Sequence, residues 1–492
     1  MPDSVRVRFA PSPTGLLHIG GLRTALYNYL FARQHEGTFV LRIEDTDRSR
    51  YVPEAEEDIV ESMRWVGLDV DEGPGKDGDF GPYHQSQRTD RYREHVDQLL
   101  ASGHAYVAFD TAEEIDAMRE RLKTPESPSP KYGLATRMQM TNALTLSEDE
   151  VGRRLDAGDE HVVRLKVEPG QTVRFDDLIR GPVAFETDAV DDQVLLKSDG
   201  FPTYHLANVV DDHAMAITHV IRGEEWLPST PKHVLLYQAF GWTPPAFAHL
   251  PLILSPTGGK LSKRNADKIG IPVSVKDYQA QGYEPEALVN FLALLGWHPG
   301  DERERFSLGD LVEAYSIERT AHSGAQFDLD KLQWFNGQVV RDLAPAEIAE
   351  RVRPAVEERV GPVETAHLEA VAALMRERLT FARDLAGAAY FFEDPATYDE
   401  KGVKKRWKDD SAGLMRAYAD RLEADDAFTE VSTEAVMRQL AEDEGVGFGR
   451  IIHPVRLATT GTTAGAGMFE TLVLIGREAT VRRLRRAAGE LG

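Results

Sequence analysis

The first 43 residues constrain the fold most, because they predict a strand, a turn, a helix and a second strand in that order. Hydrophobic residues alternate with arginines over 5–9, which is typical of a half-buried strand. Residues 11–15 are rich in proline and glycine and predict a turn, and the apolar spacing over 20–35 predicts a helix. A second strand is predicted over 38–43. Such a strand–helix–strand unit opens a parallel, doubly wound sheet of the Rossmann type.

The other strands of this sheet lie far downstream, with 192–197, 217–222 and 250–254 as the best candidates. We therefore expect an α+β domain inserted between the two halves of an α/β domain, and helical spacing dominates from about 285 onward. The predicted organisation is a first half over 1–92, the inserted domain over 93–190, a second half over 191–256, a further domain over 257–343 and an all-α region with two subdomains over 344–492.

Composition narrows the class of protein. The chain of 492 residues has no cysteine, which excludes disulfides and thiolate zinc sites. Its net charge of -24 argues against a non-specific nucleic-acid coat but allows an RNA partner met by local basic patches. No apolar run approaches about eighteen residues, and the N-terminus lacks the pattern of a signal peptide. We expect a cytoplasmic protein without a membrane segment.

The string P-S-P-T-G-L-L-H-I-G-G over 11–21 joins the first strand to the first helix. Gly20 and Gly21 let a nucleotide approach the backbone closely, and the free N–H groups at a helix start favour anions. His18 can donate a hydrogen bond to a phosphate oxygen in the transition state. His18 alone fits an ordinary solvated helix cap equally well, but the full string favours a nucleotide site.

A second motif, K-L-S-K-R over 260–264, follows the turn at 256–259. The adjacent glycines of that turn make the loop flexible. Lys260 and Lys263 can meet the phosphates of ATP as charge builds on the leaving pyrophosphate. A basic surface turn is the alternative interpretation, but the pairing with the first motif favours activation of a carboxylate with ATP.

Together these motifs resemble those of class I aminoacyl-tRNA synthetases, and specifically of glutamyl-tRNA synthetases of the bacterial zinc-free type. Four further strings match the family: R-I-E-D-T-D at 42–47, S-D-G-F-P-T-Y-H-L-A-N-V-V-D-D at 198–212, V-I-R-G-E-E-W at 220–226 and F-D-L-D-K-L-Q-W-F-N at 327–336. The resemblance covers nearly the whole chain. It implies that L-glutamate is activated with ATP and Mg²⁺ and transferred to the 3′ end of tRNA(Glu). It also implies that 93–190 binds the acceptor end, 257–343 contacts the stem and 344–492 binds the anticodon.

The resemblance implies a glutamate pocket whose chemistry the residues explain. Arg8 and Arg222, each at a strand end, would clamp the side-chain carboxylate, because a guanidinium presents a planar fork to it. Glu44 would meet the α-ammonium. The other expected pocket residues are Ala10, Ser12, Tyr204 and Asn208. Glutamine would leave buried arginine without a counterion, so we expect discrimination without an editing domain. For any single arginine, a surface ion pair is the alternative.

The resemblance also places residues at the ATP and tRNA sites. The expected ATP-binding residues are Pro11, His18, Gly20, Gly21, Glu225, Trp226, Lys260, Ser262, Lys263 and Arg264, of which His18, Lys260 and Lys263 are the catalytic candidates. Glu225 would accept from a ribose hydroxyl and Trp226 would pack beside the adenosine. Asp47 matches a position that contacts the tRNA end, and Arg378 matches an arginine that reads an anticodon base. Arg378 fits a solvated helix face equally well.

Two basic islands and the absence of thiolates complete the predictions. Residues 404–408, with Trp407, could touch RNA, whereas 482–486 are expected to solvate the last helix. Residues 105–110 lack the cysteines of relatives that bind zinc, so we expect no metal site and no zinc. We expect a monomer that activates glutamate only when tRNA is bound.

Four alternatives remain open from the sequence. The chain could charge tRNA(Gln) instead of, or in addition to, tRNA(Glu), although its C-terminal half reads as helical rather than as β-barrels. It could be a truncated relative that modifies an RNA base, a small-molecule adenylyltransferase, or an RNA-binding module without catalysis. The long C-terminal region and the strand-end residues disfavour the last three.

Overall fold

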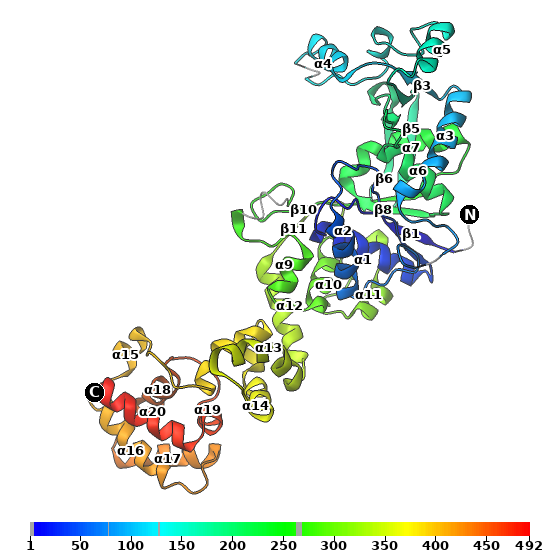
Figure 1. The fold of residues 1–492 in the computed structure, drawn as a ribbon. Helices are drawn as coiled ribbons and strands as arrows, with labels where there is room; N and C mark the ends of the chain where they lie inside the picture. Colours follow the sequence, from blue (N-terminus) through cyan, green and yellow to red (C-terminus); the bar gives the residue numbers. More distant parts are fainter. Residues whose placement is uncertain (1–3, 77, 126–127, 262–267) are drawn as a thin grey trace. The chain divides into compact units, whose positions relative to one another are not determined.

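The computed structural model describes residues 4–76, 78–125, 128–261 and 268–492, which divide into two compact units (Figure 1). The first unit comprises the described residues up to 281 together with 288–329, and the second comprises 282–287 and 330–492. Helices α10 (Pro285–Leu294) and α12 (Leu329–Asp342) pass from one unit to the other along the chain. No helix in the described ranges is long and apolar enough to cross a membrane.

The predicted strand–helix–strand unit is confirmed at the N-terminus. Strand β1 (Arg6–Phe9) leads to helix α1 (Ile19–Gln34) and then to β2 (Thr38–Leu41), and the two strands pair in parallel from Arg6↔Thr38 to Phe9↔Leu41. Ten of the sixteen residues of α1 are buried, among them Leu22, Leu26 and Leu30 at helical spacing, so the local pattern was sufficient to predict this helix.

Four more strands extend the α/β domain, in the order β6 (Gly181–Glu186), β5 (Thr172–Asp177), β9 (Ala246–Leu250) and β8 (His219–Gly223). β8, β9 and β5 run parallel, whereas β6 is antiparallel to β5. β8 continues toward β1, since the Thr218 N–H donates to the Arg6 carbonyl at 2.9 Å. Helices α6 (Tyr204–Ala214) and α7 (Thr230–Phe240) contribute buried residues to the same core as these strands.

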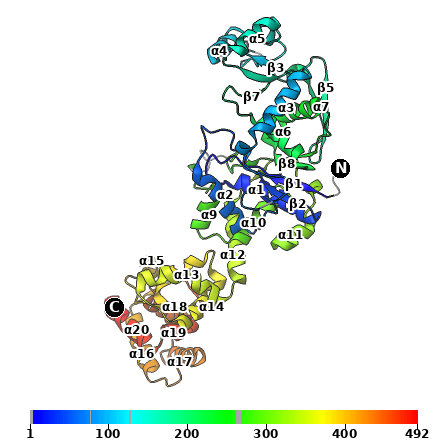
Figure 2. The same cartoon turned by 45° about the vertical axis from the view of Figure 1, so that its right-hand side comes forward.

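The prediction that 192–197 belongs to this sheet is wrong. Its strand β7 (Val194–Leu196) pairs antiparallel with β4 (Val162–Leu165), which pairs with β3 (Ala105–Ala108) (Figure 2). Conversely, β5 and β6 fall inside the predicted insertion but join the α/β sheet. Alternation of hydrophobic residues identifies a strand, but the strand with which it pairs depends on residues far away in the sequence. The boundaries of the inserted domain therefore stay predictions.

The prediction over 250–254 is also displaced. The sheet strand β9 ends at Leu250, and the next residues form the short β10 (Ile253–Leu254), which pairs with β11 (Ala325–Gln326). Among the described residues, the first unit also contains the helices α2 (Pro53–Trp65), α3 (Thr89–Ala101), α4 (Ala112–Arg121), α5 (Glu148–Asp156), α9 (Val275–Ala280) and α11 (Leu308–Ala314).

The second unit is helical throughout its described residues, as predicted. Its helices are α13 (Pro345–Val360), α14 (Thr365–Met375), α15 (Glu400–Arg406), α16 (Ser411–Glu423), α17 (Glu430–Asp443), α18 (Gly449–Thr460), α19 (Met468–Ile475) and α20 (Arg477–Glu490). One core cluster centres on α13 and α14, and another on α16 to α20. Gly476, with φ of 88°, separates α19 from α20.

The two basic islands of this unit differ. Trp407 is 8% exposed and packs in the second core cluster, so the prediction that its ring could touch RNA is wrong. In the other island, Arg482 is exposed, but Arg483 is buried. The Arg483 guanidinium donates to the carbonyls of Tyr390, Glu393 and Thr459 at 2.7 to 2.9 Å and pairs with Asp394. Arg483 therefore fastens α20 to the segments that precede it.

Candidate active site

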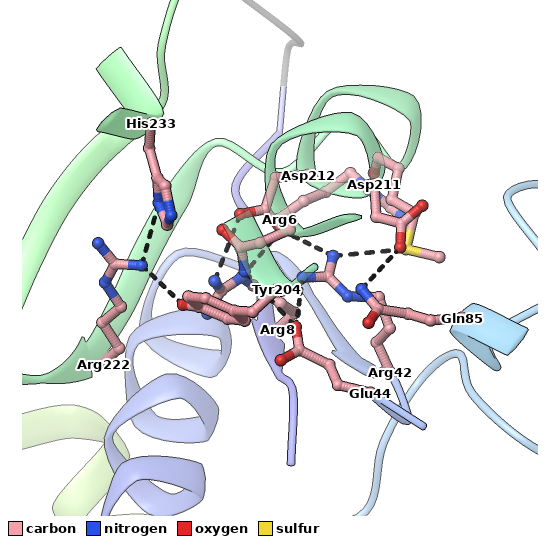
Figure 3. A network of polar contacts seen from close by, with 12 residues as sticks. Arg6, Arg8, Arg42, Glu44, Gln85, Tyr204, Asp211, Asp212, Arg222 and His233 are labelled. Carbon is pink, nitrogen blue, oxygen red and sulfur yellow. Dashed lines mark hydrogen bonds and ion pairs between the residues drawn. The ribbon is translucent and has the colours of Figure 1, made fainter. Parts of the chain in front are cut away.

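Charged residues from β1, the end of β2, β8 and α6 meet in the first unit, where the ends of neighbouring strands converge (Figure 3). Arg8, Arg222, Glu44 and Asn208 are all buried, and Tyr204 is half-buried. In Figure 3 the ring of Tyr204 lies between Arg222 on one side and Arg8 and Glu44 on the other. The strand ends thus bring together the residues predicted for the pocket.

Arg8 already has a counterion within the protein. Its Nε and Nη2 donate to the Oδ1 and Oδ2 of Asp212 at 3.0 and 3.3 Å. Arg42 Nη1 donates to Asp212 Oδ1 at 2.7 Å. Burial acts to raise the pKa of Asp212, but the charges of Arg8 and Arg42 outweigh it and leave that pKa below its ordinary value. A substrate carboxylate at Arg8 would therefore share the guanidinium with Asp212.

Arg42 is the central residue that the sequence did not single out. It is fully buried and bridges two carboxylates, because its Nη2 lies 3.2 Å from Glu44 Oε1 while its Nη1 contacts Asp212. Burial raises the pKa of Glu44, with Arg42 and Arg8 opposing the rise. Asn208 links the same groups: with its amide oxygen toward the arginines, it accepts from Arg8 and Arg42 at 3.1 and 3.2 Å. The spacing of Arg42 and Glu44 by two residues was the available signal.

Arg222 differs from both arginines because its partners are neutral. The guanidinium donates to Tyr204 Oη at 2.8 Å, Thr230 Oγ1 at 2.9 Å, His249 Nε2 at 3.1 Å and His233 Nδ1 at 3.3 Å. It is 4% exposed, and no described Asp or Glu oxygen lies within 4.0 Å of it. A buried charge without a counterion is costly, so this position favours an anionic ligand.

His18 is placed to donate to an anion. It caps α1, and its Nδ1 accepts from the Gly21 N–H at 3.1 Å. The surrounding protein, and then the Lys260 ammonium, lower the pKa of His18. The ring is therefore neutral at pH 7, and with Nδ1 accepting, the proton lies on Nε2. A Cβ on Gly20 would lie 3.0 Å from the ring of His18, so glycine at this position leaves room for the histidine as well as for a ligand.

Glu225 and Lys260 form an ion pair beside this histidine. The Lys260 Nζ lies 2.9 Å from Glu225 Oε1, and both side chains are exposed. Burial acts to raise the pKa of Glu225, but the hydrogen bond and charge of Lys260 hold it below the usual range. Trp226 is 39% exposed and its ring lies 4.3 Å from that of Tyr204. Trp226 is thus a surface ring at the edge of the pocket rather than part of the core.

Comparison with known proteins decides the family. The family model "tRNA synthetases class I (E and Q), catalytic domain" matches residues 4–334, and the model "Anticodon binding domain" matches 347–488. The chain belongs to the class I tRNA synthetases of the E and Q family. It is 49% identical to the glutamate–tRNA ligase of Cytophaga hutchinsonii, over 98% of this chain and 97% of that one. It is 50% identical to that of Porphyromonas gingivalis, over 99% of both chains.

Solved structures of this family show the same fold. The crystal structure of a glutamate tRNA ligase from Elizabethkingia meningosepticum in complex with its amino acid superposes with a TM-score of 0.95, at 41% identity and with full coverage of both chains. The glutamate–tRNA synthetase of Elizabethkingia anophelis gives a TM-score of 0.93 at 41% identity, covering 99% of this chain and 100% of that one.

The remaining synthetase residues predicted from the sequence lie near the site or apart from it. The Pro11 carbonyl accepts from the Glu44 N–H at 3.0 Å; Ala10 is half-buried and Ser12 is exposed. Ser262, Lys263 and Arg264 lie outside the described residues. Asp47 is held within its own loop, because it accepts from Ser49 and pairs with Arg50 at 2.7 Å. Those contacts lower the pKa of Asp47 to about 2.

Arg378 lies in the short 3₁₀ segment Arg376–Arg378 of the second unit, within the stretch that matches the anticodon-binding model. It is exposed, and no described carboxylate lies within 4.0 Å of it. Within the described ranges, no group of three or more His, Asp or Glu side chains is arranged to hold a metal ion.

Proposed function

We propose that this synthetase activates L-glutamate with ATP to glutamyl-adenylate and transfers the glutamyl group to the 3′ end of tRNA(Glu). One observation carries the proposal: among the described residues, the buried Arg222 guanidinium contacts neutral side chains and no carboxylate. The glutamate–tRNA ligases that are about half identical over the full length support it.

In the first step, an α-carboxylate oxygen of glutamate attacks the α-phosphorus of ATP, and pyrophosphate leaves with the bonding electron pair. His18 Nε2–H would donate to a phosphate oxygen, and the Lys260 ammonium would turn from Glu225 toward the charge that builds on pyrophosphate. Glu225 would then be available to a ribose hydroxyl. The Mg²⁺ that accompanies ATP supplies further charge neutralisation to the phosphates.

In the second step, the 2′-hydroxyl of the terminal adenosine of tRNA attacks the glutamyl carbonyl carbon, AMP leaves with the electron pair of the broken C–O bond, and the hydroxyl proton passes to a phosphate oxygen of AMP. No side chain becomes a covalent nucleophile, so the residues act by positioning and by stabilising charge. We propose Arg222, shared with Arg8 and Tyr204, for the side-chain carboxylate, and Glu44 for the α-ammonium. An ammonium beside Glu44 would favour its ionised form, against the burial that raises the pKa of Glu44.

Exchange of labelled pyrophosphate into ATP tests this function, with glutamate or glutamine and with or without tRNA. We expect exchange with glutamate only, and only when tRNA is present. Exchange with glutamine as fast as with glutamate would refute the charge-based selection. Glutamate-dependent exchange without RNA would refute the tRNA dependence that the family resemblance implies.

The alternative, an enzyme that also charges tRNA(Gln), depends on the second unit. Arg378 is exposed and has no described acidic partner, which suits an arginine that contacts a base. Arg378→Gln should lower the ratio of kcat/KM for tRNA(Glu) to kcat/KM for tRNA(Gln). An unchanged ratio would mean that Arg378 is only a solvent-exposed residue of a helix. We further propose that 93–190 binds the acceptor end, 257–343 the stem and 344–492 the anticodon, and that the enzyme is a cytoplasmic monomer without zinc.

A further inference from the structure

Arg222 rests on a buried chain of polar groups that the two-step reaction does not use. His249, on β9, is fully buried, and its Nε2 lies 3.1 Å from Arg222 Nε. Its Nδ1 lies 2.5 Å from Oδ2 of Asp177, a buried residue at the end of β5. The neighbouring strands β8, β9 and β5 thus supply an arginine, a histidine and an aspartate in sequence across the sheet.

The hydrogen bonds fix the tautomer of His249. The other oxygen of Asp177, Oδ1, accepts from the backbone N–H groups of Ile179, Arg180 and His249 at 3.0, 2.9 and 3.3 Å. This carboxylate has only acceptors to offer, so His249 must present Nδ1–H to it. Burial lowers the pKa of His249, which keeps the ring neutral. Its Nε2 therefore carries a lone pair, which accepts from the Arg222 Nε–H.

We propose that Asp177 and His249 are positioning residues that orient the Arg222 guanidinium for the side-chain carboxylate of the amino acid substrate. Their role rests on the proposed function, because it needs an acidic substrate at Arg222. The imidazole ring stands between the carboxylate and the guanidinium, so Arg222 is anchored without being paired to a protein carboxylate. This arrangement differs from that of Arg8, which contacts Asp212 directly.

The consequence is selectivity for a negative charge. If Asp177 touched Arg222, the pair would be satisfied without substrate, and an acidic side chain would gain little there. His233 is a second imidazole with one nitrogen at Arg222 and the other at a further polar side chain. Its Nδ1 lies 3.3 Å from Arg222 Nη1, and its Nε2 lies 3.1 Å from His205 Nδ1. Neutral acceptors thus hold the guanidinium and leave its charge for the ligand.

Asp177→Asn in the full chain tests the proposal through the tautomer. The amide oxygen of the new side chain is required by the three backbone N–H groups, so its NH₂ faces His249 Nδ1. The imidazole proton must then move to Nε2, where it opposes the Arg222 Nε–H. Since a hydrogen bond to a charged group contributes about 1.5–3 kcal/mol, we expect KM for glutamate to rise about 10- to 100-fold, with KM for ATP within about twofold of wild type.

Asp71→Asn is the matched control. Asp71 also accepts from a backbone N–H, of Phe39 at 2.7 Å, and from a side chain, Arg33 Nη1 at 2.7 Å, but contacts none of the residues around Arg222. It should leave KM for both substrates unchanged. A KM for glutamate within about threefold of wild type in Asp177→Asn, or an equal rise in KM for ATP, would overturn the proposal.

A second pair of variants decides the matter if Asp177→Asn fails to fold. In His249→Gln the amide oxygen can take the place of Nε2 and accept from Arg222. In His249→Asn the shorter amide keeps the contact with Asp177 but does not reach Arg222. We expect the glutamine variant to retain a lower KM for glutamate than the asparagine variant, and equal or reversed values overturn the proposal. Absence of glutamate-dependent exchange in the wild-type enzyme would instead reject the proposed function itself.

Discussion

Replacement of Arg222 by methionine should separate substrate binding from folding. The side chain keeps a similar apolar stem but loses the guanidinium, whose N–H groups are shared among four neutral side chains. The bound carboxylate would lose two charge-assisted hydrogen bonds, each contributing about 1.5–3 kcal/mol. The resulting loss of about 3–6 kcal/mol corresponds to a fall in kcat/KM for glutamate of about a hundredfold to a few ten-thousandfold.

Arg42→Met provides the comparison for stability. Arg42 is the partner of two buried carboxylates, so its loss leaves Asp212 with Arg8 alone and Glu44 without its ion pair. Removing one member of a buried ion pair typically costs about 3–5 kcal/mol of folding free energy. Arg222→Met leaves no carboxylate without its counterion, so its cost to stability should be smaller.

The assays are pyrophosphate exchange in the presence of tRNA and thermal unfolding followed by circular dichroism. Arg222→Lys, which keeps the charge but not the planar fork, should give an intermediate kcat/KM for glutamate. The reasoning is refuted if Arg222→Met keeps glutamate kcat/KM within about threefold of wild type. It is equally refuted if Arg222→Met lowers the unfolding midpoint as much as Arg42→Met does.

Three further outcomes are expected. Gly20→Ala should displace the His18 ring and lower kcat for exchange at least about tenfold. Gly152→Ala, where an added Cβ on α5 meets no other atom, should leave kcat unchanged. Equal kcat values in the two variants would contradict the steric conflict expected at His18. Burial lowers the pKa of His205 to about 4 and the pKa values of His233 and His249 below 6.5. As the pH falls below 6.5, these three histidines are therefore protonated in the unfolded chain before they are protonated in the native one. This contribution to stability is complete above pH 6.5 and is lost as the pH falls from 6.5 toward the native pKa values. The free energy of unfolding then falls by up to about 1.4 kcal/mol per pH unit for each histidine. A midpoint of thermal unfolding that does not change between pH 7.5 and 5 would contradict this prediction. Arg483→Met should destabilise the second unit by about 3–5 kcal/mol, because it leaves the carbonyls of Tyr390, Glu393 and Thr459 without this donor and removes one of the arginines paired with Asp394. Arg482→Met, at the exposed pair with the same Asp394, should cost less than about 1 kcal/mol, and denaturant unfolding of the two variants measures the difference.

The parts of the fold that depend on neighbouring residues were predictable. Strand β1, helix α1 and strand β2 follow from hydrophobic spacing within 5–43, and the strand-end positions of Arg8 and Arg222 follow from the strands that carry them. The same is true of the all-helical second unit. In each case, the pattern that identifies the element lies within the element itself.

The rest depends on partners far along the chain. Nothing within 192–197 says that β7 pairs with β4, and nothing around Trp407 says that its ring is buried. The site shows the same division. Arg42 becomes central only when Asp212, 170 residues later, is folded beside it. The neutral surroundings of Arg222 likewise come from residues on α7 and β9 that carry no motif of their own.

The contact between the exposed ring of Trp226 and the ring of Tyr204 gives the enzyme an intrinsic optical reporter. Tyr204 contacts Arg222, where we propose that the amino acid binds, and the indole of Trp226 faces solvent where we propose that the nucleotide binds. Binding of either ligand should therefore alter the fluorescence of this tryptophan. Trp226→Phe would remove that signal, so the variant measures the background of the other five tryptophans. After this background is subtracted, the emission of the wild-type enzyme could follow the binding of amino acid and of nucleotide in real time and without a label.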